Sequence, residues 1–155
     1  MGHSIEALII PESAAGLVSE MLPHTRAVSL GHGLRLVPIT AATFDALRER
    51  FPNLQDPPDP EFWKLSGPIA FVAQELSQRG AVAYVETDYF GGNGEQAATV
   101  WEFGSVRMPP TQADTGPINA ALRLMGVRAR FMHDEFDTVG FGANRNNDDW
   151  LELEL

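Results

Sequence analysis

Two segments rich in β-branched and aromatic residues lie on either side of a glycine cluster. The first reads "AVAYVETDYF" over 81–90 and the second reads "AATVWEF" over 97–103, compositions typical of β-strands. Between them, Asn93 and Gly94 form a dipeptide that suits a tight hairpin turn because it tolerates positive φ. We therefore predict a long antiparallel hairpin over about 82–103. Gly91 and Gly92 exceed what this turn requires, which indicates a bulge or a close approach by another backbone.

The remaining segments predict a single α+β domain over 1–155. Runs of strands stand beside runs of helices, which favours a mainly antiparallel sheet covered on one face by three to four helices. Pro109 and Pro110 predict a loop after the hairpin. The expected helices are 13–22, 40–51, 66–80 and 117–125, and the expected further strands are 5–10, two around 31–33, 127–131 and 150–155.

Composition and charge narrow the classes of partner. The chain has no cysteine, which excludes disulfides, thiol catalysis and cysteine-based zinc sites and fits a reducing cytoplasm. No apolar run reaches the roughly 20 residues that span a bilayer. The net charge of −10 opposes binding to nucleic acid and to anionic membranes. A basic protein partner is compatible with this charge, and so is a simple gain in solubility.

The stretch "GNGEQA" over 92–97 matches the loose nucleotide-binding pattern GxGxxA. Such a loop binds pyrophosphate only when a helix N-terminus follows the glycines. Here the following residues predict a strand, and Glu95 would place a carboxylate where phosphate should lie. No lysine follows to complete a P-loop. We therefore expect a hairpin without a nucleotide, and no cofactor.

Two groups of carboxylates are candidates for chemistry. Glu86 and Asp88 lie two apart on a predicted strand, so their side chains point to the same side. If the segment from His133 and Asp134 to Asp137 met them in space, the carboxylates could share acid and base roles or bind Mg²⁺ or Ca²⁺. A solvated acidic face explains the same residues without chemistry. The histidines lack the HxH or HExxH spacing of metal ligands, so no metal site is predicted.

The acidic segments also contain aromatic residues that suit a protein interface. Aromatic anchors supply affinity and carboxylates steer a basic partner. Phe141 is expected to be exposed with them, whereas Trp150 is expected to anchor the core, and Arg145 is expected to pair with a neighbouring carboxylate. The residues expected to bind the partner are Glu86, Asp88, Tyr89, Phe90, Asn93, Glu95, Asp134, Glu135, Asp137 and Arg145.

The stretches "ELSQRG", "YFGGNGEQAATVW" and "DEFDTVGFG…DDW" together resemble small acidic bacterial proteins. Some proteins of this size and character resemble immunity proteins, which neutralise a toxin by binding it. The resemblance covers the C-terminal half of the chain and implies a partner-binding role. We therefore expect a non-enzymatic binding module. The alternatives are a small hydrolase or other enzyme using the clustered carboxylates, and a structural subunit that buries its hairpin in a homodimer.

Overall fold

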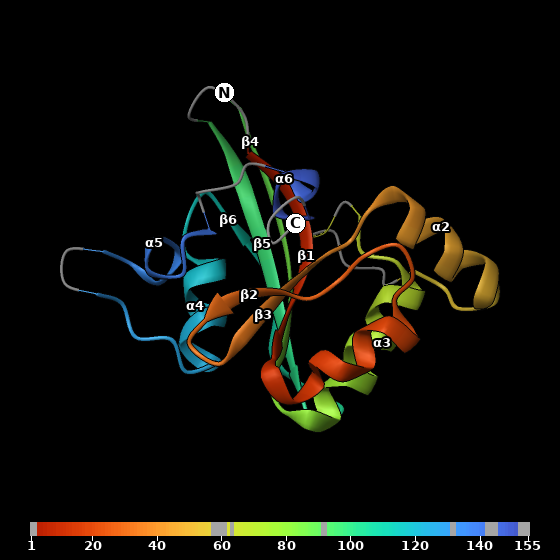
Figure 1. Cartoon of the computed structure of the whole chain (residues 1–155). Helices are drawn as coiled ribbons and strands as arrows, with labels where there is room; N and C mark the ends of the chain where they lie inside the picture. Colours follow the sequence, from red (N-terminus) through yellow and green to blue (C-terminus); the bar gives the residue numbers. More distant parts are fainter. Residues whose placement is uncertain are drawn as a thin grey trace.

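The structure is a computed structural model that describes residues 3–56, 62, 64–90, 93–130, 133–141 and 146–151. Its centre is one six-stranded sheet in the order β2-β3-β1-β4-β5-β6, and every neighbouring pair of strands is antiparallel (Figure 1). The predicted hairpin and the α+β class are confirmed. The strands are β1 (His3–Pro11), β2 (Val28–Gly31), β3 (Leu34–Pro38), β4 (Val82–Phe90), β5 (Asn93–Glu102) and β6 (Ser105–Ala113).

Helices lie on both faces of this sheet, so the prediction of one covered face is wrong. Figure 1 shows α2 and α3 on one side of the sheet, which we call the α3 face, and α4 and α5 on the other, the α4 face. The helical elements are the 3₁₀ helices η1 (Glu12–Leu17) and η2 (Ser77–Arg79), and the α-helices α1 (Val18–Met21), α2 (Ala41–Arg50), α3 (Gly67–Leu76), α4 (Pro117–Leu124), α5 (Glu135–Thr138) and α6 (Asn147–Leu151).

The central strands explain why both faces are covered. In β1, Ile5, Ala7 and Ile9 join the core on the α4 face. Leu8 and Ile10 join the core on the α3 face. Because successive strand residues point to opposite faces, a run of apolar residues such as "ALII" needs apolar cover on both sides.

Side-chain caps begin the two longest helices. The Thr40 hydroxyl accepts a hydrogen bond from the Thr43 amide at 3.1 Å and caps α2. The Ser66 hydroxyl accepts one from the Ile69 amide at 3.2 Å and caps α3. Each cap satisfies an amide that the first helical turn leaves without a partner.

The edge of the sheet and the C-terminal region differ from the predictions. Residues 105–113 form β6, although Pro109 and Pro110 had predicted a loop. The register of β6 against β5 shifts at these prolines, and β6 has a strand on only one side, so their missing amides are tolerated. Residues 127–130 form no strand, and residues 147–151 form the helix α6 instead of a strand.

The register of the hairpin moves its turn from the predicted position. Phe90 pairs with Asn93 and Tyr89 pairs with Gly94, so the Asn93-Gly94 pair lies within β5. Gly91 and Gly92 lie outside the described residues. Gly94 has φ +154°, and a Cβ there would lie 2.0 Å from the Asp88 carbonyl oxygen. A close backbone approach therefore occurs at Gly94, whereas the one predicted for Gly91 and Gly92 lies outside the described residues.

Candidate functional site

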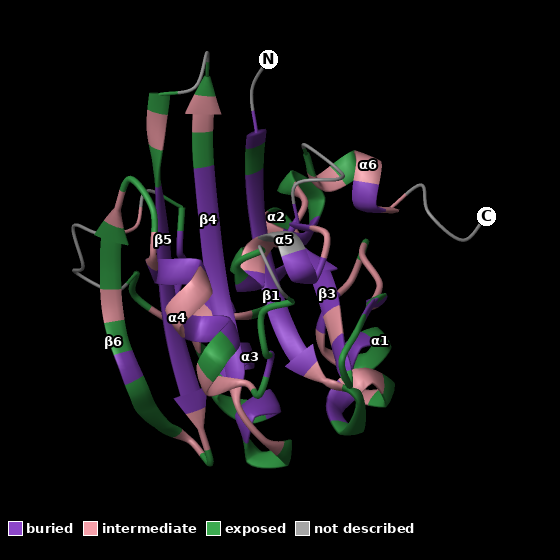
Figure 2. Cartoon of the chain, turned by 90° about the vertical axis from the view of Figure 1, so that its left-hand side faces the viewer, coloured by how far each residue is buried: buried purple, intermediate pink, exposed green. Residues whose placement is uncertain are grey.

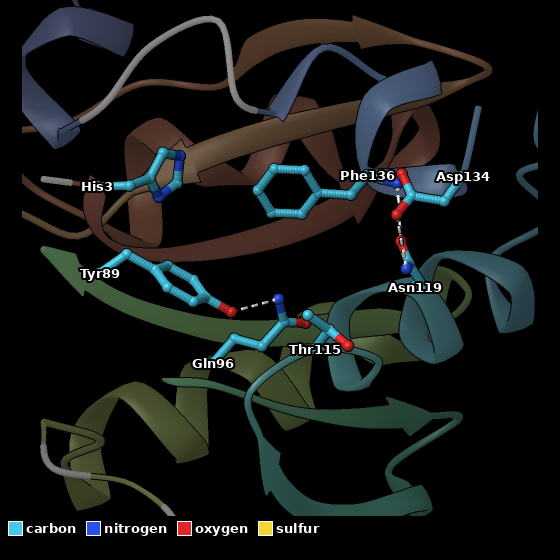
Figure 3. A pocket seen from close by; sticks show the side chains of 7 residues that line it. All are labelled: His3, Tyr89, Gln96, Thr115, Asn119, Asp134 and Phe136. Atoms are coloured by element: carbon cyan, nitrogen blue, oxygen red, sulfur yellow. Dashed lines mark hydrogen bonds between the residues drawn. The ribbon is translucent and has the colours of Figure 1, made fainter. Parts of the chain in front are cut away.

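A pocket of about 290 Å³ lies on the α4 face, between the hairpin and the helices that cover it (Figure 3). Its walls include three rings, and Figure 3 shows the rings of Tyr89 and Phe136 facing the same space. Residues from β1, β4, β5, α4 and α5 and from the segments before α4 and α5 contribute to it. The lining residues are His3, Tyr89, Gln96, Thr115, Asn119, Asp134 and Phe136.

Most polar side chains of this pocket bind one another or nearby backbone. The Gln96 amide donates to the Tyr89 hydroxyl at 2.9 Å, and its carbonyl oxygen accepts from the Ile118 amide at 2.8 Å. The Asn119 amide donates to the Asp134 carboxylate at 3.1 Å and accepts from the Phe136 amide at 2.8 Å. These bonds position the walls, and the pocket offers a ligand mainly ring surface.

His3 ties the first strand to this side of the molecule. Its Nδ1 lies 2.7 Å from the Thr87 hydroxyl, and its Nε2 lies 3.2 Å from the Phe141 carbonyl oxygen. The imidazole also packs against Phe136 and Phe141, with centroids 5.8 and 5.7 Å away. His3 therefore holds β1 against the segment that follows α5.

On the α3 face, two carboxylates are buried side by side. Glu6 of β1 pairs with Glu86 of β4 in the strand register, so their side chains point to the same face. Glu86 is fully buried and accepts hydrogen bonds from the Tyr84 hydroxyl at 2.7 Å and the Lys64 amide at 3.0 Å. The Lys64 ammonium lies 3.2 Å from Glu6 Oε1. Burial, and then the Glu86 carboxylate, raise the pKa of Tyr84 well above its ordinary value.

A second pocket, of about 250 Å³, opens beside Glu6. Apolar residues of the loop before α2 and of α2 itself form one side, and Glu6, Asp45, Lys64 and Asn147 supply polar groups. Both polar atoms of the Asn147 side chain bind backbone groups, because it accepts from the Glu6 amide at 3.1 Å and donates to the Ile39 carbonyl oxygen at 2.9 Å.

The residues of β4 and β5 become more exposed towards the end of the hairpin (Figure 2). Asp88 and Glu95 lie directly opposite each other on β4 and β5, and both are exposed. Phe90, two residues beyond Asp88 on the same face, is 78% exposed. The Gln112 amide donates to the Glu95 carboxylate at 2.6 Å. Among the described residues, Asp88 has no ion pair.

The structure separates the two carboxylate groups that the sequence suggested might meet. Glu86 lies on the α3 face, whereas Asp134 precedes α5 and binds Asn119 of α4 on the opposite face. Glu135 is buried and pairs with Arg123 at 2.8 Å. In the parts of the chain that the structure describes, no group of three or more histidine and acidic side chains could hold a metal ion.

Several residues predicted to contact a partner have other positions. Glu86 is buried, and so is Phe141, which packs with its centroid 6.3 Å from that of Trp150 in the core. Trp150 is a core residue, as predicted. His133 is exposed, and Asp88, Tyr89, Phe90, Asn93 and Glu95 all lie near the end of the hairpin. Arg145 and the side chain of Asp137 lie outside the described residues.

No protein-family model, curated protein or solved structure matches this chain. Within the described ranges, no helix has the length and apolar composition needed to cross a membrane. The candidate site therefore depends on the geometry and charge of these residues alone.

Sequence reasoning missed two residues of the α3 face. Glu6 interrupts the apolar run "IEALII", and a charged residue within a strand that is otherwise buried on both faces was a usable signal. Lys64 had no comparable signal, because its approach to Glu6 joins residues 58 positions apart.

Proposed function

We propose that this chain is a non-enzymatic protein-binding module that binds a basic protein through the end of its β4–β5 hairpin. The contact surface, which we call the hairpin end, consists of Asp88, Phe90, Asn93 and Glu95. The observation that supports the proposal most is the position of Asp88 and Glu95, two exposed carboxylates directly opposite each other beside the exposed Phe90.

This arrangement has a cost in the free protein. Like charges directly opposite each other on neighbouring strands destabilise a sheet by a fraction of a kcal/mol. A cationic partner would remove that repulsion and gain from both carboxylates. Phe90 would supply the apolar anchor that such interfaces use, and the charge would accelerate encounter.

Two other exposed hydrophobic side chains are in a different electrostatic setting. Phe103 and Val106 lie at the opposite end of β5, where Arg107 pairs with Glu102. That end therefore has its carboxylate already neutralised by a cation of the same chain. The hairpin end lacks such a pair among the residues described, which favours it as the surface for a basic partner.

A cationic toxin is the partner class that fits this proposal together with the resemblance to immunity proteins. An immunity protein acts by covering its toxin, so it needs a rigid charged surface and no catalytic group. The enzyme alternative is less favoured, since Glu86 and Asp134 lie on opposite faces of the sheet and cannot share a substrate.

The test exchanges the charge of the hairpin end. In the double variant Asp88→Lys/Glu95→Lys, each exchange adds two positive charges, so the net charge changes from −10 to −6. The control Glu20→Lys/Glu49→Lys makes the same change at exposed positions on α1 and α2. Wild type and both variants are used to capture proteins from a lysate of the source organism, and the captured basic protein is then purified.

Association of the purified partner is measured by surface plasmon resonance at low and physiological salt. We expect the hairpin-end variant to slow association at least about tenfold at low salt, because steering by charge accelerates encounter by 10- to 1,000-fold. The control variant should retain most of the wild-type rate. If both variants slow association equally, the effect comes from net charge alone and the proposal is contradicted. The proposal is also contradicted if neither variant changes the amount of partner that is captured.

A further inference from the structure

Glu6, which lines the second pocket, has a covered acceptor oxygen without a donor among the described residues. The Glu6 side chain is only 9% exposed, and its Oε2 is buried without a hydrogen-bond partner among the described residues. Leaving a buried carboxylate oxygen without a donor is costly, because the lost hydration is not replaced. The pocket of about 250 Å³ lies against this side chain.

The charges around the pocket favour a cation. Glu6 and Asp45 line it, and Glu86 lies directly beside Glu6 in the strand register. Lys64 is the only cationic side chain among the described residues that line this pocket. The N-terminus of α2, at Ala41, adds a partial positive charge. The negative charge of these three carboxylates still exceeds the positive charge of one ammonium and one helix N-terminus.

The Lys64 ammonium is only weakly held beside Glu6. Its ammonium lies 3.2 Å from Glu6 Oε1, and its side chain is 50% exposed. An ammonium approaches a carboxylate as a point charge, whereas a guanidinium presents a planar fork that matches both carboxylate oxygens. Lys64 thus acts as a tethered cation that satisfies one oxygen and leaves the other unpaired.

We propose that this pocket binds a guanidinium group, supplied by an arginine side chain of the basic partner. The guanidinium would displace the half-exposed Lys64 ammonium and pair with both oxygens of Glu6, after a small movement of the covered Oε2. Phe44 also lines the pocket, and an aromatic ring attracts a cation placed over its face. The identity of the partner rests on the proposed function, but the recognition of guanidinium by Glu6 does not.

The pocket and the hairpin end belong to one surface. Glu6, Glu86, Asp88 and Glu95 all point to the α3 face of three neighbouring strands, β1, β4 and β5. A basic partner bound at Asp88 and Glu95 would therefore lie within a few residues of Glu6. The exposed carboxylates would steer the partner, and the buried one would select arginine over lysine.

The experiment titrates the whole chain with methylguanidinium chloride and follows amide resonances by NMR. N-methylurea is the neutral control of similar shape, and methylammonium tests the preference for a planar fork. We expect saturable shifts at Ile39, Ala41 and Phe44 with methylguanidinium, weaker shifts with methylammonium and none with N-methylurea. Binding of N-methylurea as strong as that of methylguanidinium, or no saturable binding at all, would overturn the proposal.

Two variants act in opposite directions. Glu6→Gln keeps the shape of the side chain and should abolish binding of methylguanidinium. Lys64→Met removes the tethered cation and should increase affinity by about two- to fivefold, the range expected for losing a competitor of a part-exposed ion pair. If Glu6→Gln does not fold, Lys64→Met still decides, because an unchanged or lower affinity would contradict displacement of the ammonium.

A further variant separates this inference from the proposed function. Asp88→Lys/Glu95→Lys should leave the binding of methylguanidinium within about twofold of wild type, because these carboxylates do not line the pocket. If methylguanidinium binds while the hairpin-end variants fail to alter capture, the pocket stands and the proposed surface falls. If methylguanidinium does not bind while the hairpin-end variant alters capture, the guanidinium site is refuted and the proposed protein-binding function stands.

Discussion

Replacing Tyr84 by phenylalanine tests the buried hydrogen bond from its hydroxyl to Glu86, the carboxylate that links β4 to the segment before α3. Tyr84 is fully buried, and its hydroxyl donates to Glu86 Oε2 at 2.7 Å. The substitution removes this donor and keeps the ring, which packs edge-on against Phe62 with centroids 5.4 Å apart. Glu86 Oε2 would retain the bond from the Lys64 amide at 3.0 Å.

The size of the effect at neutral pH follows from the charge and burial of the acceptor. A hydrogen bond to a charged group contributes about 1.5–3 kcal/mol to stability. Because Glu86 is fully buried, water cannot replace the lost donor without opening the structure. We expect Tyr84→Phe to lower the free energy of unfolding by about 1.5–3 kcal/mol at pH 7.

The difference should shrink at alkaline pH. Burial, and then the charge and hydrogen bond of Glu86, raise the pKa of Tyr84 well above its ordinary value of 10.0. The folded protein therefore keeps this proton while the unfolded chain loses it above pH 10, so the wild type is destabilised as pH rises. At pH 11 this loss is about 1.4 kcal/mol, since one pKa unit corresponds to about that energy. The phenylalanine variant has no such proton to lose.

Urea unfolding followed by tryptophan fluorescence at pH 7, 9, 10 and 11 measures both effects. Tyr89, whose pKa burial also raises, is present in both proteins, so its contribution cancels in the difference. The stability difference should be constant from pH 7 to 9 and then fall by about 1.4 kcal/mol by pH 11. A variant as stable as wild type at pH 7, or a difference that does not change with pH, would refute the reasoning.

The remaining predictions concern the hairpin and the core. Gly94→Ala should lower the free energy of unfolding by about 1–3 kcal/mol or more. Alanine is strained at φ +154°, and its Cβ would clash with the Asp88 carbonyl oxygen. In the same chemical denaturation assay, Gly16→Ala should be neutral or slightly stabilising, since nothing lies within 4 Å of its Cβ position. Phe141→Ala should cost about 3–5 kcal/mol in thermal and urea unfolding, because the ring is fully buried. Phe90→Ala, at an exposed ring, should change stability by less than about 0.5 kcal/mol, and a cost like that of Phe141→Ala would place Phe90 in a core.

The hairpin and the starts of two helices could be predicted from the sequence because each depends on neighbouring residues. Thr40 and Ser66 cap helices three residues away, and the composition of 81–90 and 97–103 indicates strands without knowledge of the rest of the chain. β6 was missed because prolines forbid a central strand but are tolerated on an edge, and edge position depends on the complete sheet.

The candidate site was predictable only in part, because its key contacts are long-range. The hairpin follows from local sequence, but the pairing of Asp88 with Glu95 does not, because the Asn93-Gly94 pair expected to form the turn lies within β5. Burial of Glu86 depends on its pairing with Glu6, 80 positions away in the chain. Phe141 seemed exposed within an acidic segment, yet its position is decided by His3 and Trp150.

The prolines of β6 bear on how this chain behaves at high concentration. An open sheet edge invites the edge of another molecule, and such pairing can continue into aggregates. Pro109 and Pro110 offer an arriving strand two consecutive positions without an amide hydrogen, beside a break in register. A homodimer that continued the sheet through β6 would lack the backbone hydrogen bonds that these two amides would otherwise donate. The opposite edge, β2, has only four residues and provides little length for pairing. The molecule can thus display an acidic, partly apolar hairpin end with little risk that its sheet polymerises.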